Sequence, residues 1–95
     1  MKLVSVKKST VSGKKFTATF TMSNGKKKQV HFGATGYTDY TLSGDKTKRK
    51  NYRARHAKEK SQAADTPGAL AYHILWGEST SRAENIKAFK RKYGV

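Results

Sequence analysis

The chain has no cysteine, one proline and only six acidic residues among its 95. Without cysteine it can form no disulfide, no zinc–thiolate site and no thiol nucleophile, so the fold depends on packing alone. No apolar run approaches the roughly 20 residues that span a bilayer, and the opening residues lack the apolar stretch of a signal peptide. We therefore expect a soluble intracellular protein with one modest core, a single small basic domain over residues 1–95, which excludes a two-domain enzyme.

Positive charge is what the sequence has in excess. It contains 21 Lys and Arg residues and has a formal net charge of +15. Residues 1–32 hold eight lysines and no acid, and residues 46–60 hold eight Lys or Arg against one acid, Glu59. A charge this far from zero exceeds what solubility requires and attracts polyanions. A polyanion such as a nucleic acid is therefore a predicted partner.

The first third of the chain predicts a β-meander. In residues 14–22, "KKFTATFTM", aromatic and apolar side chains alternate with threonines, which is the period of a strand with one buried face. Asn24-Gly25 follows and is a strong hairpin signal, so residues 26–32 are expected to return as the next strand. A first strand is expected at about residues 3–7.

Three helices are expected after the strands, at about residues 46–60, 66–77 and 81–93. Pro67 suits the first position of the second helix, and Gly77 is expected to end it in a left-handed conformation. The predicted fold class is therefore α+β, a three-stranded antiparallel β-meander followed by three α-helices packed on one face of the sheet.

Residues 31–45, "HFGATGYTDYTLSGD", contain no Lys or Arg. We expect this segment to fold inward, with Asp39 accepting hydrogen bonds from loop amides or pairing with Arg53 or Arg55 to anchor the basic helix. The alternative is that its two tyrosines are exposed platforms on which bases stack. The predicted structural anchor comprises Tyr37, Asp39, Tyr40 and Trp76.

The sequence contains no catalytic or metal-binding motif. His31, His56 and His73 fall on three different elements without metal-ligand spacing, and a structural role is expected for each. The glycines of "HFGATG" lack the spacing of a phosphate loop or a dinucleotide fingerprint. We therefore predict no catalytic residue, no metal, no cofactor and no small-molecule substrate, and a protein that is not an enzyme.

The basic residues are expected to contact phosphates rather than base edges, because on a helix those of residues 46–60 spread over several faces. The alternative is a merely solvated surface. The predicted polyanion-binding residues are Lys26, Lys27, Lys28, Lys46, Lys48, Arg49, Lys50, Arg53, Arg55, Lys58, Lys87, Lys90 and Arg91.

Four blocks of residues, "GKKKQVHFGATGYTDYT", "RKNYRARHAKEK", "PGALAYHILWG" and "ENIKAFKRKYG", carry a family resemblance. Together they resemble the small basic proteins of nucleocytoplasmic large DNA viruses, over roughly residues 15–95. The resemblance implies a viral context, with the protein in the virion and, during infection, in the host cytoplasm or viral factory. One expectation is a genome-associated protein whose basic surface neutralises the phosphates of viral DNA. The alternative is a minor capsid or cement protein that contacts acidic capsid neighbours or the inner membrane.

Overall fold

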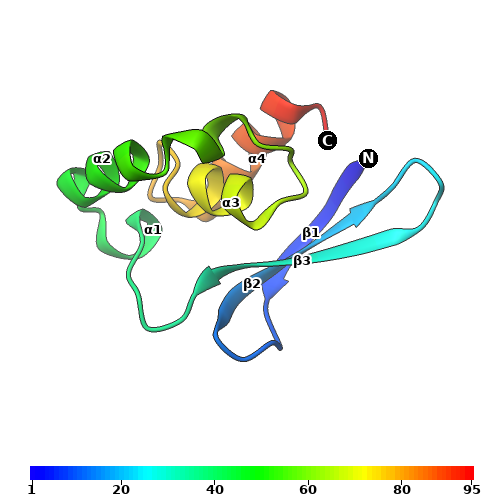
Figure 1. Ribbon diagram of the computed structural model, residues 1–95, viewed down its shortest axis with the longest axis horizontal. Coiled ribbons are helices and arrows are strands. Elements are labelled where there is room, and N and C mark those ends of the chain that lie inside the picture. Colours follow the sequence, from blue (N-terminus) through cyan, green and yellow to red (C-terminus); the bar gives the residue numbers. More distant parts are fainter.

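The computed structural model describes residues 1–95 and has an α+β architecture. Three antiparallel strands form a sheet in the order β1-β2-β3, and the helices follow in the chain (Figure 1). The helical segments of residues 67–75 and 82–93 pack on one face of the sheet, whereas the helix of residues 46–55 extends past its end. The predicted fold class is confirmed. The strands are β1 (Lys2–Lys8), β2 (Lys14–Thr21) and β3 (Lys27–Ala34). The helices are α1 (Tyr40–Ser43), α2 (Lys46–Arg55), the 3-10 helix η1 (Ala57–Ser61), α3 (Pro67–Leu70), the π-helix η2 (Ala71–Leu75) and α4 (Arg82–Tyr93).

The alternation in β2 and β3 directs one face of the sheet toward the helices. Ala18 pairs with Val30 in the antiparallel register, and both are buried. The threonines of β2 lie on the opposite face. There, His31 of β3 hydrogen-bonds through Nδ1 with the Thr17 hydroxyl at 2.7 Å. This histidine thus links two strands on the open face of the sheet.

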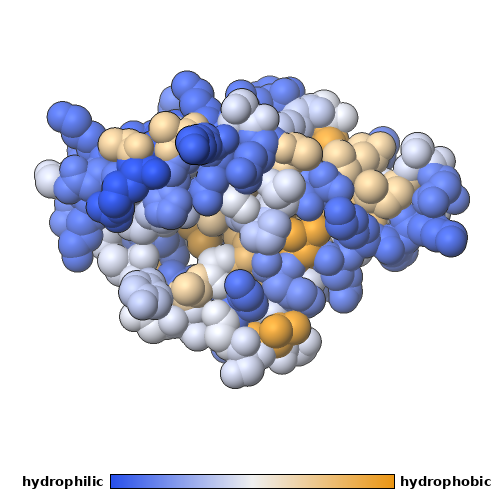
Figure 2. Space-filling model, viewed as in Figure 1, coloured by the Kyte–Doolittle hydropathy of each residue, from blue (hydrophilic) through white to orange (hydrophobic).

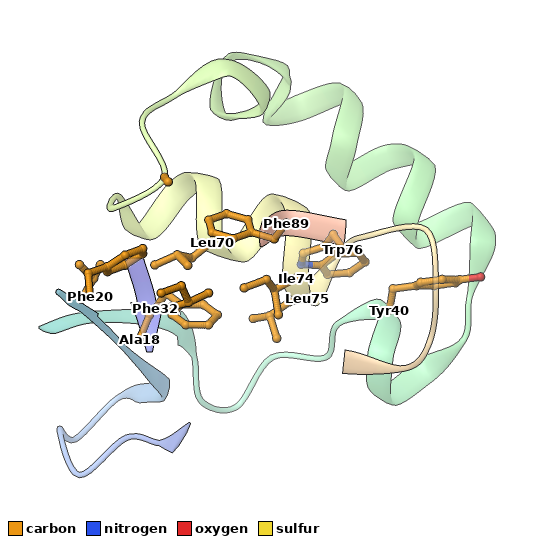
Figure 3. Close-up of a cluster of buried hydrophobic side chains, with 12 residues drawn as sticks. Ala18, Phe20, Phe32, Tyr40, Leu70, Ile74, Leu75, Trp76 and Phe89 are labelled. Atoms are coloured by element: carbon orange, nitrogen blue, oxygen red, sulfur yellow. The ribbon is translucent and has the colours of Figure 1, made fainter. Parts of the chain in front are cut away.

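The hydrophobic core lies between the sheet and the helices (Figure 3). Phe20 and Phe32 project from the sheet and are completely buried. They meet side chains of α3, η2 and α4, whose largest buried members are Leu70, Ile74, Leu75 and Phe89. Burying an aromatic ring removes on the order of 150 to 250 Å² from water, so a few rings stabilise a core that contains few aliphatic residues.

The helix predicted at residues 66–77 forms, but it changes from an α-helix (α3) to a π-helix (η2) after Leu70. Thr66 caps its start by accepting a hydrogen bond from the Ala69 amide, and Pro67 occupies the first turn. The Trp76 amide then bonds back to the Ala71 carbonyl at 3.1 Å, which is the spacing of a π-helix. Gly77 does not adopt the predicted left-handed conformation. A Cβ there would lie 2.3 Å from the His73 carbonyl oxygen, so close packing, and not a positive φ, requires the glycine.

Asn85 of α4 holds the turn that follows η2. Its buried side-chain amide donates to the carbonyls of Ile74, at 2.9 Å, and Ser79, at 2.7 Å. Its carbonyl oxygen accepts from the Ser79 amide at 3.0 Å. The three bonds satisfy the Ile74 carbonyl near the end of η2 and both backbone groups of Ser79 in the turn that follows. Through this one side chain, α4 fixes the position of residues 74–79.

The helix predicted at residues 46–60 is shorter than expected, because α2 ends at Arg55 and the chain continues as η1. Hydrogen bonds from η2 and α4 fix the backbone at the end of η1. The Lys60 carbonyl accepts hydrogen bonds from His73 Nε2 at 2.9 Å and from the Tyr93 hydroxyl at 3.3 Å. Tyr93 also donates to the Gln62 carbonyl at 2.8 Å. Tertiary contacts, which local sequence does not encode, decide where α2 stops.

The stability of the fold is expected to decrease below about pH 6.5 through His73. Burial lowers the pKa of His73 below its usual value of 6.5, so the folded protein favours the neutral ring. In the window between the lowered pKa and 6.5 the unfolded chain binds the proton more strongly, and stability is lost as the pH falls. Thermal unfolding between pH 8 and 5 should show a flatter pH profile for His73→Gln than for the wild type. Parallel profiles would contradict this role.

Candidate functional site

The basic residues of α2 and η1 have no acidic partners. The eight Lys and Arg side chains in residues 46–60 form no ion pair with any carboxylate. The carboxylates that form ion pairs do so with other residues. Asp39 pairs with Lys15 at 2.7 Å, and Asp65 pairs with Lys28 at 2.8 Å. The charge on α2 and η1 therefore remains uncompensated within the chain.

Two of these eight side chains point inward. Arg49 donates from Nε to the Gly77 carbonyl at 2.6 Å, and Arg53 donates to the Trp76 carbonyl at 2.9 Å. The guanidinium of Arg53 also lies over the Tyr72 ring, 4.2 Å from its centroid, and burial lowers the pKa of this arginine. Cationic donors are favourable at carbonyls that end a helix. Arg49 and Arg53 thus attach α2 to the end of η2.

The other six side chains are exposed and have no acidic partner. They comprise Lys46, Lys48, Lys50, Arg55, Lys58 and Lys60, and we call them the α2–η1 cationic surface. Figure 2 shows hydrophilic atoms over the region where α2 lies. Because like charges this close repel one another, the surface gains free energy when an anion approaches it.

The structure does not bring all thirteen predicted polyanion-binding residues together. Lys26 and Lys27 lie at the β2–β3 hairpin, at the opposite end of the long axis from α2 (Figure 1). Lys28 is paired with Asp65, and Lys87 lies 3.7 Å from Glu84. Lys90 and Arg91 are exposed on α4. Of the predicted residues, only Lys46, Lys48, Lys50, Arg55 and Lys58 are therefore exposed on the same two consecutive helices, α2 and η1.

Asp39 anchors residues 31–45, the segment that contains no Lys or Arg, and its side chain is buried, with the residue 1% exposed. Its carboxylate caps α1 by accepting from the Thr41 amide at 2.9 Å and from the Thr41 hydroxyl, so the amide that it binds belongs to the first turn of a helix and not to a loop. Its ion-pair partner is Lys15 of β2, not Arg53 or Arg55. Arg53 donates to the Trp76 carbonyl instead, and Arg55 forms no ion pair.

The three aromatic members of the predicted anchor differ in position. Tyr40 is 6% exposed and Trp76 is 8% exposed, so both are buried as predicted. In Figure 3, Trp76 lies beside Ile74 and Leu75, whereas the Tyr40 ring points away from them. Tyr37 is 75% exposed, and the prediction that it packs inward is wrong. It follows Gly36, whose φ of +83° turns the chain outward before Asp39 returns to the core. The Tyr37 hydroxyl forms no hydrogen bond within the chain, which leaves the ring free for an external contact.

A cleft of about 570 Å³ lies where the end of the sheet, the 35–39 segment, α2 and η2 meet. We call it the α2 cleft. Its wall from α2 is a single helical face, because the lining positions recur every three to four residues. In Figure 2, hydrophobic atoms are visible in a recess framed by hydrophilic ones below α2. The lining residues are Lys15, Gly33, Ala34, Tyr37, Thr38, Asp39, Lys48, Asn51, Tyr52, Arg55, His56, Ala71, Leu75 and Trp76.

A stack of three rings fixes the wall between α2 and η2. Tyr52 lies between His56 and Trp76, with ring centroids 4.1 and 4.4 Å away. Burial, with a smaller contribution from the Glu59 carboxylate, raises the pKa of Tyr52 to about 12. Its phenol therefore stays protonated at neutral pH, so the central ring of the stack is uncharged.

The cleft was not predicted from the sequence, although one signal for it was present. Residues 48, 51, 52, 55 and 56 share one helix face and combine two cations, an amide and two rings.

The structure contains no group of three His, Asp or Glu side chains arranged to hold a metal ion. None of its helices is both long and apolar enough to traverse a lipid bilayer.

Comparison with known proteins places the chain among viral sequences. Residues 4–56 match a family of unknown function (DUF5754), a span that runs from β1 to the end of α2. The chain is also 33% identical to the uncharacterised protein L851 of Acanthamoeba polyphaga mimivirus over 78 residues, covering 75% of this chain and 78% of that protein. No solved structure matches it. The matches support a viral protein and agree with the resemblance to large DNA viruses.

Proposed function

Because the chain belongs to the DUF5754 family of unknown function and is similar to a mimivirus protein, we propose that it is a non-enzymatic viral DNA-binding protein. It contacts the phosphate backbone without reading sequence, as a component of the virion. The observation that supports this proposal is the α2–η1 cationic surface, in which six exposed cations have no acidic partner in the chain.

The chemistry of this surface suits phosphates better than base edges. Five of its six members are lysines, whose ammonium groups act as point charges on flexible stems. Sequence readout needs planar or bidentate groups held in a groove, whereas phosphate contacts require only charge and reach. Arg49 and Arg53, which could form bidentate contacts, are occupied by backbone carbonyls. The surface therefore favours binding that is independent of sequence.

Binding to duplex DNA should weaken steeply with salt and be nearly equal for unrelated sequences. Each phosphate that a lysine neutralises releases a counterion, so the logarithm of the affinity should fall with log salt by about 0.9 per contact. Fluorescence anisotropy with two duplexes of different sequence, titrated at several salt concentrations, measures both quantities. A flat salt dependence would rule out phosphate contacts, and a strong preference for one duplex would rule out sequence-independent binding.

The place of the protein in a virus particle can be tested separately. If it accompanies the genome, it should leave disrupted particles together with the DNA. If it stays with the shell at a fixed copy number, the minor capsid or cement alternative is correct instead. Mass spectrometry of the separated shell and genome fractions distinguishes these outcomes.

A further inference from the structure

The α2 cleft differs from the outward part of the cationic surface in having an apolar and aromatic interior. Lys46, Lys50, Lys58 and Lys60 lie outside it, whereas Lys48 and Arg55 line it. Ligand pockets typically enclose about 300 to 1,000 Å³ and combine apolar walls with a few polar groups. The α2 cleft, at about 570 Å³, falls in this range.

The unpaired charges that line the α2 cleft are positive and therefore suit an anionic ligand. Lys48 and Arg55 form no ion pair. The one carboxylate among the lining residues, Asp39, is already paired with Lys15 and bonded to Thr41. An entering phosphate would therefore meet two unpaired cations and no free negative charge.

The remaining lining groups suit a planar ring. Tyr37 stands exposed at the rim, and the Tyr52–Trp76 stack forms the wall between α2 and η2. Asn51, on the same wall, carries both an amide donor and a carbonyl acceptor and so can pair with the polar edge of a base. Aromatic side chains stack on bases of every kind, because each base has a π-face.

We propose that the α2 cleft binds one nucleotide unit whose base is unstacked, as in a single-stranded segment or at a strand end. The base stacks on Tyr37 and contacts the edge of the Tyr52–Trp76 stack, and the phosphates lie on Lys48 and Arg55. This inference rests on the proposed function and extends it: the outward lysines hold any phosphate backbone, and the cleft adds a preference for unpaired bases. Free nucleotides share the same chemistry and are the other source of the ligand.

The fluorescence of Trp76 reports directly on the cleft, since it is the only tryptophan and lines the wall. A short thymidine oligonucleotide should change its emission, whereas a blunt duplex and inorganic phosphate should not. A response to the mononucleotide dTMP but not to the oligonucleotide would assign the cleft to free nucleotides. No response to either, or an equal response to inorganic phosphate, would overturn the proposal.

Replacing Tyr37 by alanine should weaken binding of the thymidine oligonucleotide by roughly tenfold, the usual effect of losing one stacking ring. Tyr37→Phe should bind like the wild type, because stacking needs the ring and not the hydroxyl. Leu42→Ala is a matched control, since Leu42 is 71% exposed and does not line the cleft. Tyr37 is itself 75% exposed, so its removal should leave folding intact.

Duplex binding separates this inference from the proposed function. Tyr37→Ala should leave duplex affinity unchanged, because the outward lysines are intact. If the wild type binds duplex but Tyr37→Ala binds the oligonucleotide as well as the wild type does, the cleft inference fails and the proposed function stands. If neither nucleic acid binds, both fail.

Discussion

Replacing Lys46, Lys50, Lys58 and Lys60 by glutamine is expected to weaken duplex DNA binding by about a hundredfold or more at low salt. These four lysines are exposed, have no acidic partner and lie outside the cleft. Each one that contacts a phosphate should also reduce the salt slope by about 0.9. Anisotropy titrations of wild type and variant over a range of salt concentrations measure both changes. The fold should be unaffected, because these four side chains form no hydrogen bond or ion pair within the chain.

A variant with the same loss of charge elsewhere controls for net charge. Lys2, Lys7, Lys8 and Lys14 are also exposed and unpaired, but they lie on β1 and β2. Replacing them by glutamine removes the same four charges from the net +15. This control should keep most of the affinity and most of the salt slope. Equal losses in the two variants would show that overall charge, and not the α2–η1 cationic surface, drives binding.

Asp39→Ala is expected to lower the free energy of unfolding by about 3 to 5 kcal/mol, the usual cost of breaking a buried ion pair. The Lys15 side chain is only 13% exposed, and its ammonium group would lose its one carboxylate partner. The Thr41 amide at the start of α1 would lose its acceptor as well. Urea unfolding followed by Trp76 fluorescence measures the change.

Two further variants distinguish the buried pair from a simple loss of helix capping. Asp45→Ala removes the exposed cap of α2, which accepts from the Thr47 and Lys48 amides, and should cost about 1 kcal/mol. Combining Lys15→Met with Asp39→Asn removes both charges, and it should cost much less than Asp39→Ala. If Asp39→Ala cost no more than Asp45→Ala, the buried pair would contribute little to the fold.

The regular elements of this protein were predictable because local sequence determines them. Period-two alternation in residues 14–22 placed the buried face of β2, and Asn24-Gly25 placed the hairpin. Thr66 and Pro67 marked the start of α3. In each case the decisive interaction joins residues close in the chain or follows from the pleat of a strand.

The site was less predictable because long-range contacts assemble it. Arg49 and Arg53 look like surface cations in the sequence, yet carbonyls of residues 76 and 77 hold them. Nothing near Asp39 in the sequence identifies Lys15, which lies 24 residues earlier, as its partner. The α2 cleft likewise combines four separate segments, so only its α2 face could have been recognised in advance.

Lysine acetylation footprinting of the protein with and without duplex DNA tests the central claim most directly. Mass spectrometry reports the modification of each lysine separately, including those of α2, η1 and the strands. DNA should protect Lys46, Lys50, Lys58 and Lys60 while Lys2, Lys7 and Lys8 react as in the free protein. Protection confined to the strands, or no protection of α2 and η1 at DNA concentrations that saturate binding, would contradict the account.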